Sequence, residues 1–250
     1  MTVNISNQLA GKHAVITGAG RGIGAAIAQS LASLGATVML CGRSAGPLEA
    51  TASGIRKNGG SAEALVCDVT DLASVKAAAE FAQNKFDRLD ILVNNAGTAI
   101  PKPFEEATLE EMDRVIDINL RGLFIATQAA LKHMQDGGRI ITIGSCVGER
   151  MATPGLVAYS ATKGAVKMFT QGLSREVGSR GITVNNVQPG PIDTDLNPAS
   201  GDWATPQIAN TALKRYGHVE EVAALVAFVA GPEASYITGA NLTVDGGTNA

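Results

Sequence analysis

Residues 13–24 read His13-Ala14-Val15-Ile16-Thr17-Gly18-Ala19-Gly20-Arg21-Gly22-Ile23-Gly24, an apolar run followed by closely spaced glycines. The apolar run is typical of a buried strand, and the glycines open a segment rich in Ala, Ile and Leu that stops near Gly35. Glycines between a strand and a helix permit a tight turn and let the backbone approach a pyrophosphate, which the amides and dipole of the helix N-terminus attract. The stretch therefore predicts a nucleotide-binding turn.

Strand-like and helix-like segments alternate along the rest of the chain. Further strands are predicted at residues 37–41, 61–67, 90–93, 139–144, 182–187 and 241–244. Helices are predicted at residues 47–58, 70–86, 108–134 and 220–230, and in the run around residues 159–170. This alternation predicts an α/β, doubly wound Rossmann fold, with a central parallel sheet of about seven strands and helices on both faces. We expect one dinucleotide-binding and catalytic domain over residues 1–250.

Residues 192–213 interrupt the alternation. The segment contains Pro198, Gly201, Pro206 and Trp203, the only tryptophan of the chain. A long irregular segment within a compact domain is often a lid or a binding loop. We therefore predict a substrate lid at about residues 192–213.

Chemically useful residues follow the predicted strands. Ligands bind open parallel sheets at the carboxyl ends of the strands. The residues that stand there are the Gly18 turn, Arg43, Asp68, Asn95, Ser145 and Pro189. Their shared place in the topology predicts a single site.

The segment from Ser145 to Lys163 combines a hydroxyl, a phenol and an ammonium group. Ser145 follows a predicted strand, and Tyr159 and Lys163 are four residues apart, so on a helix they share one face. A nearby cation lowers the pKa of a phenol, which then exchanges a proton with a carbonyl or alcohol oxygen while the serine holds that oxygen. The alternative is an ordinary pair on a helix face, because a Tyr-x-x-x-Lys spacing is common.

The residue after the second predicted strand indicates which cofactor is used. An acidic residue at that position would bind a ribose 2′-hydroxyl and repel a 2′-phosphate. The chain instead has Arg43 there, with Arg21 inside the glycine turn, and two guanidinium groups suit a phosphate. The pattern favours NADP(H), and the alternative is that Arg43 is a solvated turn residue.

Composition excludes several classes of protein. Of 250 residues, 45% are hydrophobic and 17% charged, and the net charge of −3 comes without a basic run, which argues against nucleic-acid or membrane-surface partners. Cys41, Cys67 and Cys146 lack the spacing of metal ligands, so no metal site is expected. Residues 1–6 lack the pattern of a signal peptide, and no stretch is apolar for long enough to span a bilayer. We expect a cytoplasmic protein.

Taken together, the motifs resemble the single-domain type of the short-chain dehydrogenase/reductase family, in order and over nearly the whole chain. The matching motifs are the Thr17–Gly24 turn, Asn94-Asn95-Ala96-Gly97, the set Asn119, Ser145, Tyr159 and Lys163, and Pro189-Gly190 with Thr194. The stretches 138–148 and 175–190 are similar to bacterial beta-ketoacyl-acyl-carrier-protein reductases, and other ketone reductases share that similarity. Between Ser145 and Tyr159 the chain is one residue longer than many such reductases, which leaves the substrate open.

The resemblance implies a role for each matching residue. Tyr159 would be the acid/base, Lys163 would lower its pKa, Ser145 would position the substrate oxygen, and Asn119 would hold a water in a proton relay. With Arg43, the implied cofactor-binding set is Gly18, Gly20, Arg21, Gly22, Ile23, Gly24, Arg43, Asp68, Val69, Asn95, Ala96, Tyr159, Lys163, Pro189, Gly190, Ile192 and Thr194.

The resemblance also implies an assembly and an activity. Family members are usually homotetramers or homodimers, and the helix face holding Ala165, Val166 and Phe169 suits either such a contact or the core. We expect an NADP(H)-dependent oxidoreductase acting on a small carbonyl compound or secondary alcohol, most simply a ketone or ketoacyl reductase. The alternative is a non-catalytic nucleotide-sensing or regulatory protein on the same fold. Glu149, Arg150 and Trp203 either shape the pocket or are surface residues.

Overall fold

Seven parallel strands form the central layer of the computed structural model, which describes residues 7–151 and 154–250. Their order across the sheet is β3-β2-β1-β4-β5-β6-β7. The strands are β1 (His13–Thr17), β2 (Thr37–Gly42), β3 (Ser61–Val66), β4 (Leu89–Asn94), β5 (Met134–Ile143), β6 (Thr183–Pro189) and β7 (Asn241–Val244). The order reverses between β1 and β4, so the loops after these two strands diverge and leave a crevice at their carboxyl ends. The predicted doubly wound Rossmann fold is confirmed.

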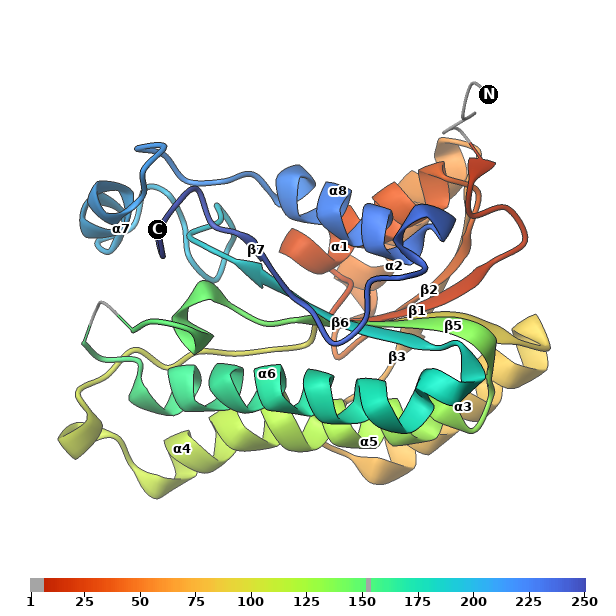
Figure 1. Ribbon diagram of the computed structural model, residues 1–250, viewed down its shortest axis with the longest axis horizontal. Helices are drawn as coiled ribbons and strands as arrows, with labels where there is room; N and C mark the ends of the chain where they lie inside the picture. The colour runs from red at the N-terminus through yellow and green to blue at the C-terminus, as the bar shows by residue number, and fades with distance from the viewer. Residues whose placement is uncertain (1–6, 152–153) are drawn as a thin grey trace.

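Helices cover both faces of the sheet (Figure 1). One layer holds α1 (Gly22–Ser33), α2 (Ala45–Lys57) and α8 (Val219–Ala230). The other holds α3 (Leu72–Phe86), α4 (Leu109–Ile116), α5 (Gly122–Leu131) and α6 (Val157–Val177). The short helix α7 (Ala204–Asn210) lies at one end of the molecule, near the carboxyl ends of the strands (Figure 1).

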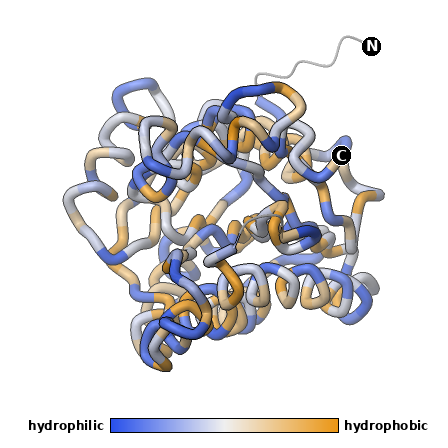
Figure 2. Tube along the Cα trace, turned by 90° about the vertical axis from the view of Figure 1, so that its left-hand side faces the viewer, coloured by the Kyte–Doolittle hydropathy of each residue, from blue (hydrophilic) through white to orange (hydrophobic). Residues whose placement is uncertain are grey.

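The burial of the strands follows from this three-layer arrangement. Every residue of β4 is buried, because helices cover it on both sides. On one face of the sheet, Ile27 and Leu31 of α1 pack with Val222 and Val226 of α8 in a single cluster. In Figure 2 the colour along the outer helices changes repeatedly between orange and blue. This is expected for helices with one apolar face, because apolar and polar residues alternate around each turn.

Two sequence-based boundaries were wrong. The helix predicted over residues 108–134 starts with the expected capping box at Thr108 but is interrupted by a π-helical segment, Asp117–Arg121. It ends at Leu131, and Met134 already belongs to β5. A π segment accommodates one extra residue per turn, and here it carries Asn119 into a buried hydrogen-bonding position. Residues 192–213 were predicted to be irregular because of their prolines. The segment nevertheless contains the short helix α7.

Residues 1–6, on which the absence of a signal peptide was predicted, lie outside the described residues. Ala152 and Thr153 of the segment between Ser145 and Lys163 also lie outside them. Among the helices of residues 7–151 and 154–250, none has both the length and the hydropathy needed to cross a bilayer.

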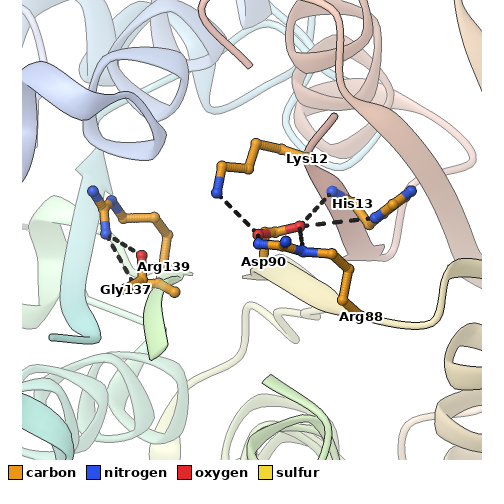
Figure 3. A network of polar contacts seen from close by, with 7 residues as sticks. Lys12, His13, Arg88, Asp90, Gly137 and Arg139 are labelled. Atoms are coloured by element: carbon orange, nitrogen blue, oxygen red, sulfur yellow. Dashed lines mark hydrogen bonds and ion pairs between the residues drawn. The ribbon is translucent and has the colours of Figure 1, made fainter. Parts of the chain in front are cut away.

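A cluster of charged residues around Asp90 lies at the amino-terminal ends of β1 and β4 (Figure 3). The Asp90 side chain is 5% exposed and accepts hydrogen bonds from Lys12 Nζ at 3.0 Å, the His13 backbone N–H at 3.0 Å and Arg88 Nε at 3.1 Å. Burial opposes ionisation of the carboxyl, but the hydrogen bonds from Arg88, His13 and Lys12 outweigh it and hold its pKa below the usual range. The cluster ties β1 to β4.

Replacing Asp90 with alanine is expected to lower the free energy of unfolding by about 2–3 kcal/mol at pH 7. The loss stays below the sum of three charged hydrogen bonds because Lys12 and Arg88 are half exposed and screened by water. Since folding lowers the pKa of Asp90, its contribution is complete above about pH 4 and is lost as the pH falls through the folded value. Urea unfolding against pH measures both effects. Asp113→Ala, at an exposed site on α4, is the control, and equal losses in the two variants would contradict the prediction.

Candidate active site

The turn after β1 is locked to the turn after β4. The Asn95 side-chain amide donates to the carbonyls of Thr17 and Gly18, both at 3.0 Å, while the Thr17 hydroxyl accepts from the backbone amides of Asn95 and Ala96. Gly18 has a φ of +66°, and a Cβ on Gly24 would stand 2.3 Å from the Gly18 carbonyl oxygen. No side chain caps the N-terminus of α1. The turn from Gly18 to Gly24, called the cradle below, thus presents free backbone amides. Such amides suit a pyrophosphate.

One cavity of about 560 Å³ opens between this cradle and the carboxyl ends of the neighbouring strands. Every residue predicted to bind the cofactor lines it, from the Gly18 turn to Thr194. Ser145 lines it as well. The structure therefore brings together residues that are separated by up to 176 positions in the chain, namely Gly18 and Thr194.

Arg43, Asp68 and Val69 line the cavity after β2 and β3. A hydrogen bond from the Thr70 backbone lowers the pKa of the Asp68 carboxyl most, and the charge of Arg43 adds to this lowering. Arg21 Nη1 lies 3.4 Å from Asp195 Oδ2, and both side chains are exposed. Arg21 and Arg43 line the same cavity, with Asp195 as a neighbour of Arg21 and Asp68 as a neighbour of Arg43.

Ser145, Tyr159 and Lys163 meet at the middle of the cavity. Ser145 precedes the 3₁₀ turn Cys146–Gly148, its hydroxyl accepts from the Val147 backbone amide at 3.4 Å, and it lines the cavity together with the Tyr159 phenol. Lys163 lies one turn along α6, with its Nζ 5.5 Å from the centroid of the Tyr159 ring. The ammonium donates to the Ile143 carbonyl oxygen at 2.8 Å. The predicted grouping of hydroxyl, phenol and ammonium is present.

The pKa values at this site differ from the sequence-based expectation. Burial raises the pKa of Tyr159 to about 12, although the hydrogen bond with Ser145 opposes the rise. Burial also lowers the pKa of Lys163 to about 8. The predicted lowering of the Tyr159 pKa by Lys163 is not found, because burial penalises both charged forms and the ammonium is directed at Ile143. Near pH 7 the phenol is protonated and thus able to donate a proton.

Asn119 lies behind the cavity wall rather than on it. Its side-chain amide donates to the Thr98 carbonyl at 3.0 Å and to the Thr162 hydroxyl at 3.1 Å, and its side-chain oxygen accepts from the Thr98 amide. Asn119 is 2% exposed, and Thr162 is the neighbour of Lys163 on α6. The side chain therefore ties α6 to the loop after β4.

Several cavity-lining residues had no signal in the sequence. Thr98, Ile118 and Thr248 carry no recognisable motif, and Thr248 reaches the site only because the C-terminal segment folds back over it. Asn249 anchors that segment by donating to the Cys146 carbonyl at 2.8 Å. The sequence left open whether Glu149, Arg150 and Trp203 shape the pocket or lie at the surface. Arg150 and Trp203 line the cavity. Glu149 does not, because its carboxylate binds Lys167 and Gln188.

Comparison with known proteins assigns the family. A family model described as enoyl-(acyl carrier protein) reductase matches residues 18–249. A short-chain dehydrogenase from Burkholderia cenocepacia J2315, solved in complex with NADP, is 45% identical, with a TM-score of 0.95 and coverage of 98% of this chain and 100% of that chain. The chain belongs to the short-chain dehydrogenase/reductase family.

Curated short-chain dehydrogenase/reductase relatives differ in their described roles. The 3-oxoacyl-[acyl-carrier-protein] reductase of Escherichia coli K12 is 42% identical over 240 residues, covering 95% of this chain and 97% of the relative. The cyclic-di-GMP-binding biofilm dispersal mediator protein of the same organism is also 42% identical, over 236 residues, covering 94% of this chain and 96% of the relative. Membership makes this protein an oxidoreductase, while two relatives equally similar to it bear different functional names.

Within residues 7–151 and 154–250, no group of three or more His, Cys, Asp or Glu side chains is arranged to hold a metal ion.

Proposed function

We propose that this protein is an NADPH-dependent ketone or ketoacyl reductase that uses Ser145, Tyr159 and Lys163. The observation that carries the proposal is that a protonated phenol, a serine hydroxyl and an ammonium group line the same cavity as the glycine turn at the uncapped N-terminus of α1. Structural neighbours solved in complex with NADP or NADPH support the same cofactor.

The cavity offers a different group of lining residues for each part of NADPH. The cradle from Gly18 to Gly24 and the amides of α1 would hold the pyrophosphate, and Arg43 would hold the 2′-phosphate. The segment from Pro189 to Thr194 would hold the nicotinamide side. When bound, NADPH supplies a hydride to a carbonyl carbon.

The chain itself supplies the proton. Tyr159 would donate its phenolic proton to the carbonyl oxygen while the Ser145 hydroxyl holds that oxygen, so that no free alkoxide forms. The Lys163 ammonium, at a pKa of about 8, remains mostly protonated at pH 7 and would stabilise the phenolate left behind. A phenol whose pKa is raised to about 12 is protonated at neutral pH, so the proton that reduction requires is present on Tyr159.

Steady-state oxidation of NADPH and of NADH, each with ketones, diketones, quinones and a ketoacyl thioester, tests this function. We expect turnover with NADPH well above that with NADH, and the best substrate identifies the class. Binding of NADPH without turnover of any carbonyl compound would count against a reductase.

Arg43→Asp is expected to shift the cofactor preference toward NADH by about tenfold to a few hundredfold, since a charged hydrogen bond contributes roughly 1.5–3 kcal/mol. The new carboxylate would repel a 2′-phosphate and accept from a 2′-hydroxyl. The ratio of kcat/KM for NADPH to that for NADH measures the shift. Lys57→Asp, an equal charge change at an exposed position on α2, is the control, and an unchanged ratio in Arg43→Asp would refute the assignment.

We also infer assembly into a homotetramer or homodimer through α4, α5 and α6. Exposed apolar side chains gather on these helices, including Leu109, Phe124 and Met168. Val166 is fully buried in the chain, whereas the half-buried Phe169 packs on Phe124 with ring centroids 5.1 Å apart. The inferred contact therefore uses the Phe124–Phe169 side of α6. A cytoplasmic location and a lid role for residues 192–213 remain predictions.

A second candidate is a nucleotide-sensing protein, favoured by the similarity to the cyclic-di-GMP-binding relative. The same amide-lined cradle suits a phosphodiester. Competition between cyclic-di-GMP and NADPH for the protein, with no carbonyl turnover, would support sensing. Turnover with NADPH that cyclic-di-GMP leaves unchanged would support the reductase.

A further inference from the structure

The turn that follows Ser145 packs directly on helix α6. A Cβ on Gly148 would stand 2.8 Å from both the carbonyl carbon and the carbonyl oxygen of Lys163, so the turn lies as close to the helix as backbone atoms allow. Within the turn, the backbone amides of residues 148–150 donate to the carbonyls of Ser145 and Cys146 at 3.0 to 3.3 Å. The place of the Ser145 hydroxyl relative to α6 therefore depends on how this turn is held.

Glu149 ends the turn and joins it to two other elements. One oxygen of its carboxylate forms an ion pair with Lys167 of α6, and the other accepts from the side-chain amide of Gln188 on β6 at 3.2 Å. Gln188 is 1% exposed, and its own amide oxygen accepts from the Thr243 hydroxyl of β7 at 3.5 Å. The Glu149 carboxylate thus links the turn to the helix and to the buried side of the sheet.

Lys167 lies on the side of α6 that carries the site. Tyr159, Lys163 and Lys167 follow at intervals of four residues, so each stands about one helical turn beyond the last. The side chains of Lys167 and Glu149 are 32% and 30% exposed, so water screens their attraction only in part. The hydrogen bond from Lys167 is the largest cause that lowers the pKa of the Glu149 carboxyl, which is therefore charged at neutral pH.

Glu149 does not line the cavity, whereas Ser145 and Tyr159 do, so it can affect a reaction there only through the groups that it holds. Fixing the turn fixes the hydroxyl at its start. A hydroxyl that is misplaced by a fraction of an ångström holds a substrate oxygen less well during proton transfer, and this lowers the rate.

We propose that Glu149 is a positioning residue, which fixes the Ser145 hydroxyl beside the Tyr159 phenol by tying the Ser145 turn to α6 and β6. The proposal rests on the proposed reductase function, to which it adds a residue that sequence motifs did not mark as part of the site. Loss of the carboxylate loosens the turn and lowers kcat, while the cradle that binds NADPH stays as it is.

Amide hydrogen exchange of the turn tests the positioning without relying on turnover. Lys167→Met removes the ion pair and leaves the sequence of residues 144–150, and hence its intrinsic exchange rates, unchanged. We expect peptides covering that range to exchange about three- to tenfold faster than in the wild type, because the turn opens more easily. Peptides of α1 should keep their rates. Arg175→Met, at an exposed position on the same helix, is the control and should leave the exchange of the turn unchanged.

A double-mutant cycle tests whether Glu149 acts through Ser145. The probes are 2,3-butanedione and acetoacetyl-coenzyme A with NADPH, or the compound of the carbonyl panel with the highest kcat/KM. We expect Glu149→Ala to lower kcat about tenfold, with an unchanged dissociation constant for NADPH, and to cause little further loss in the Ser145→Ala background. Glu149→Gln keeps an acceptor for Gln188 and should recover part of the loss. Glu176→Ala, at an exposed position on α6, should keep full activity.

The two measurements separate failure of the proposal from failure of the reductase function. Faster exchange of the turn in Lys167→Met, without carbonyl turnover by the wild type, supports the positioning of Ser145 by Glu149 and rejects the reductase. Unchanged exchange of the turn, or equally faster exchange throughout α1, overturns the proposal even where ketones are reduced. An equal loss of kcat from Glu149→Ala with and without Ser145→Ala also overturns it, since the loss then does not pass through Ser145.

Discussion

Tyr159→Phe is expected to lower kcat for ketone reduction by about 10²–10⁴-fold, the contribution that a positioned proton donor typically makes. The substitution removes only the phenolic oxygen of a residue that lines the cavity together with Ser145. The ring and its packing beside Lys163 remain, so the affinity for NADPH and the free energy of unfolding should change little. Steady-state kinetics, NADPH binding by nicotinamide fluorescence and thermal unfolding measure the three quantities.

Tyr236→Phe is the matched control, because Tyr236 is fully exposed and lies outside the cavity. It loses the same atom and is expected to keep full activity. Wild-type turnover in Tyr159→Phe would reject the proton-donor role. An equal loss of activity in both variants would point to a general effect of removing a phenol rather than to catalysis.

Gly24→Ala is expected to raise the dissociation constant of NADPH at least about tenfold and to lower the free energy of unfolding by about 1–3 kcal/mol. The added methyl group would lie 2.3 Å from the Gly18 carbonyl oxygen and 2.5 Å from the Asn95 amide nitrogen. Neither group can withdraw freely, because Asn95 holds the turn through its hydrogen bonds to Thr17 and Gly18. Helix α1 must therefore move away from the turn, which distorts the cradle.

Gly54→Ala separates this steric effect from the general effect of removing a helical glycine. Gly54 lies within α2, and an added methyl group there meets no atom within 4 Å. It is expected to stabilise the protein by about 0.5–1 kcal/mol and to leave NADPH binding unchanged. Isothermal titration with NADPH and urea unfolding distinguish the two variants. Destabilisation by Gly54→Ala, or unchanged NADPH affinity in Gly24→Ala, would contradict the expected roles of the two glycines.

The fold and most of the candidate site followed from local patterns. A strand ending in Thr17, glycines and an apolar helix describe a βα turn whatever surrounds them, and each residue that follows a strand must stand at the carboxyl edge of a parallel sheet. For this reason the sequence predicts that Gly18, Arg43, Asn95 and Ser145 lie together, and in the structure all four line one cavity. The spacing of Tyr159 and Lys163 likewise placed them on one face of a helix.

Features that depend on burial or on distant partners were decided by the tertiary structure alone. The sequence predicted a lowered pKa for Tyr159, whereas packing raises it, because desolvation depends on every neighbour and not on the residue four positions away. The π segment around Asn119, the helix within residues 192–213 and the pairing of Arg21 with Asp195 likewise depend on contacts between segments far apart in the chain. The sequence by itself determined which residues are available at the sheet edge. The tertiary structure decided their protonation and partners, because electrostatic and hydrogen-bonding energies depend on distances in space.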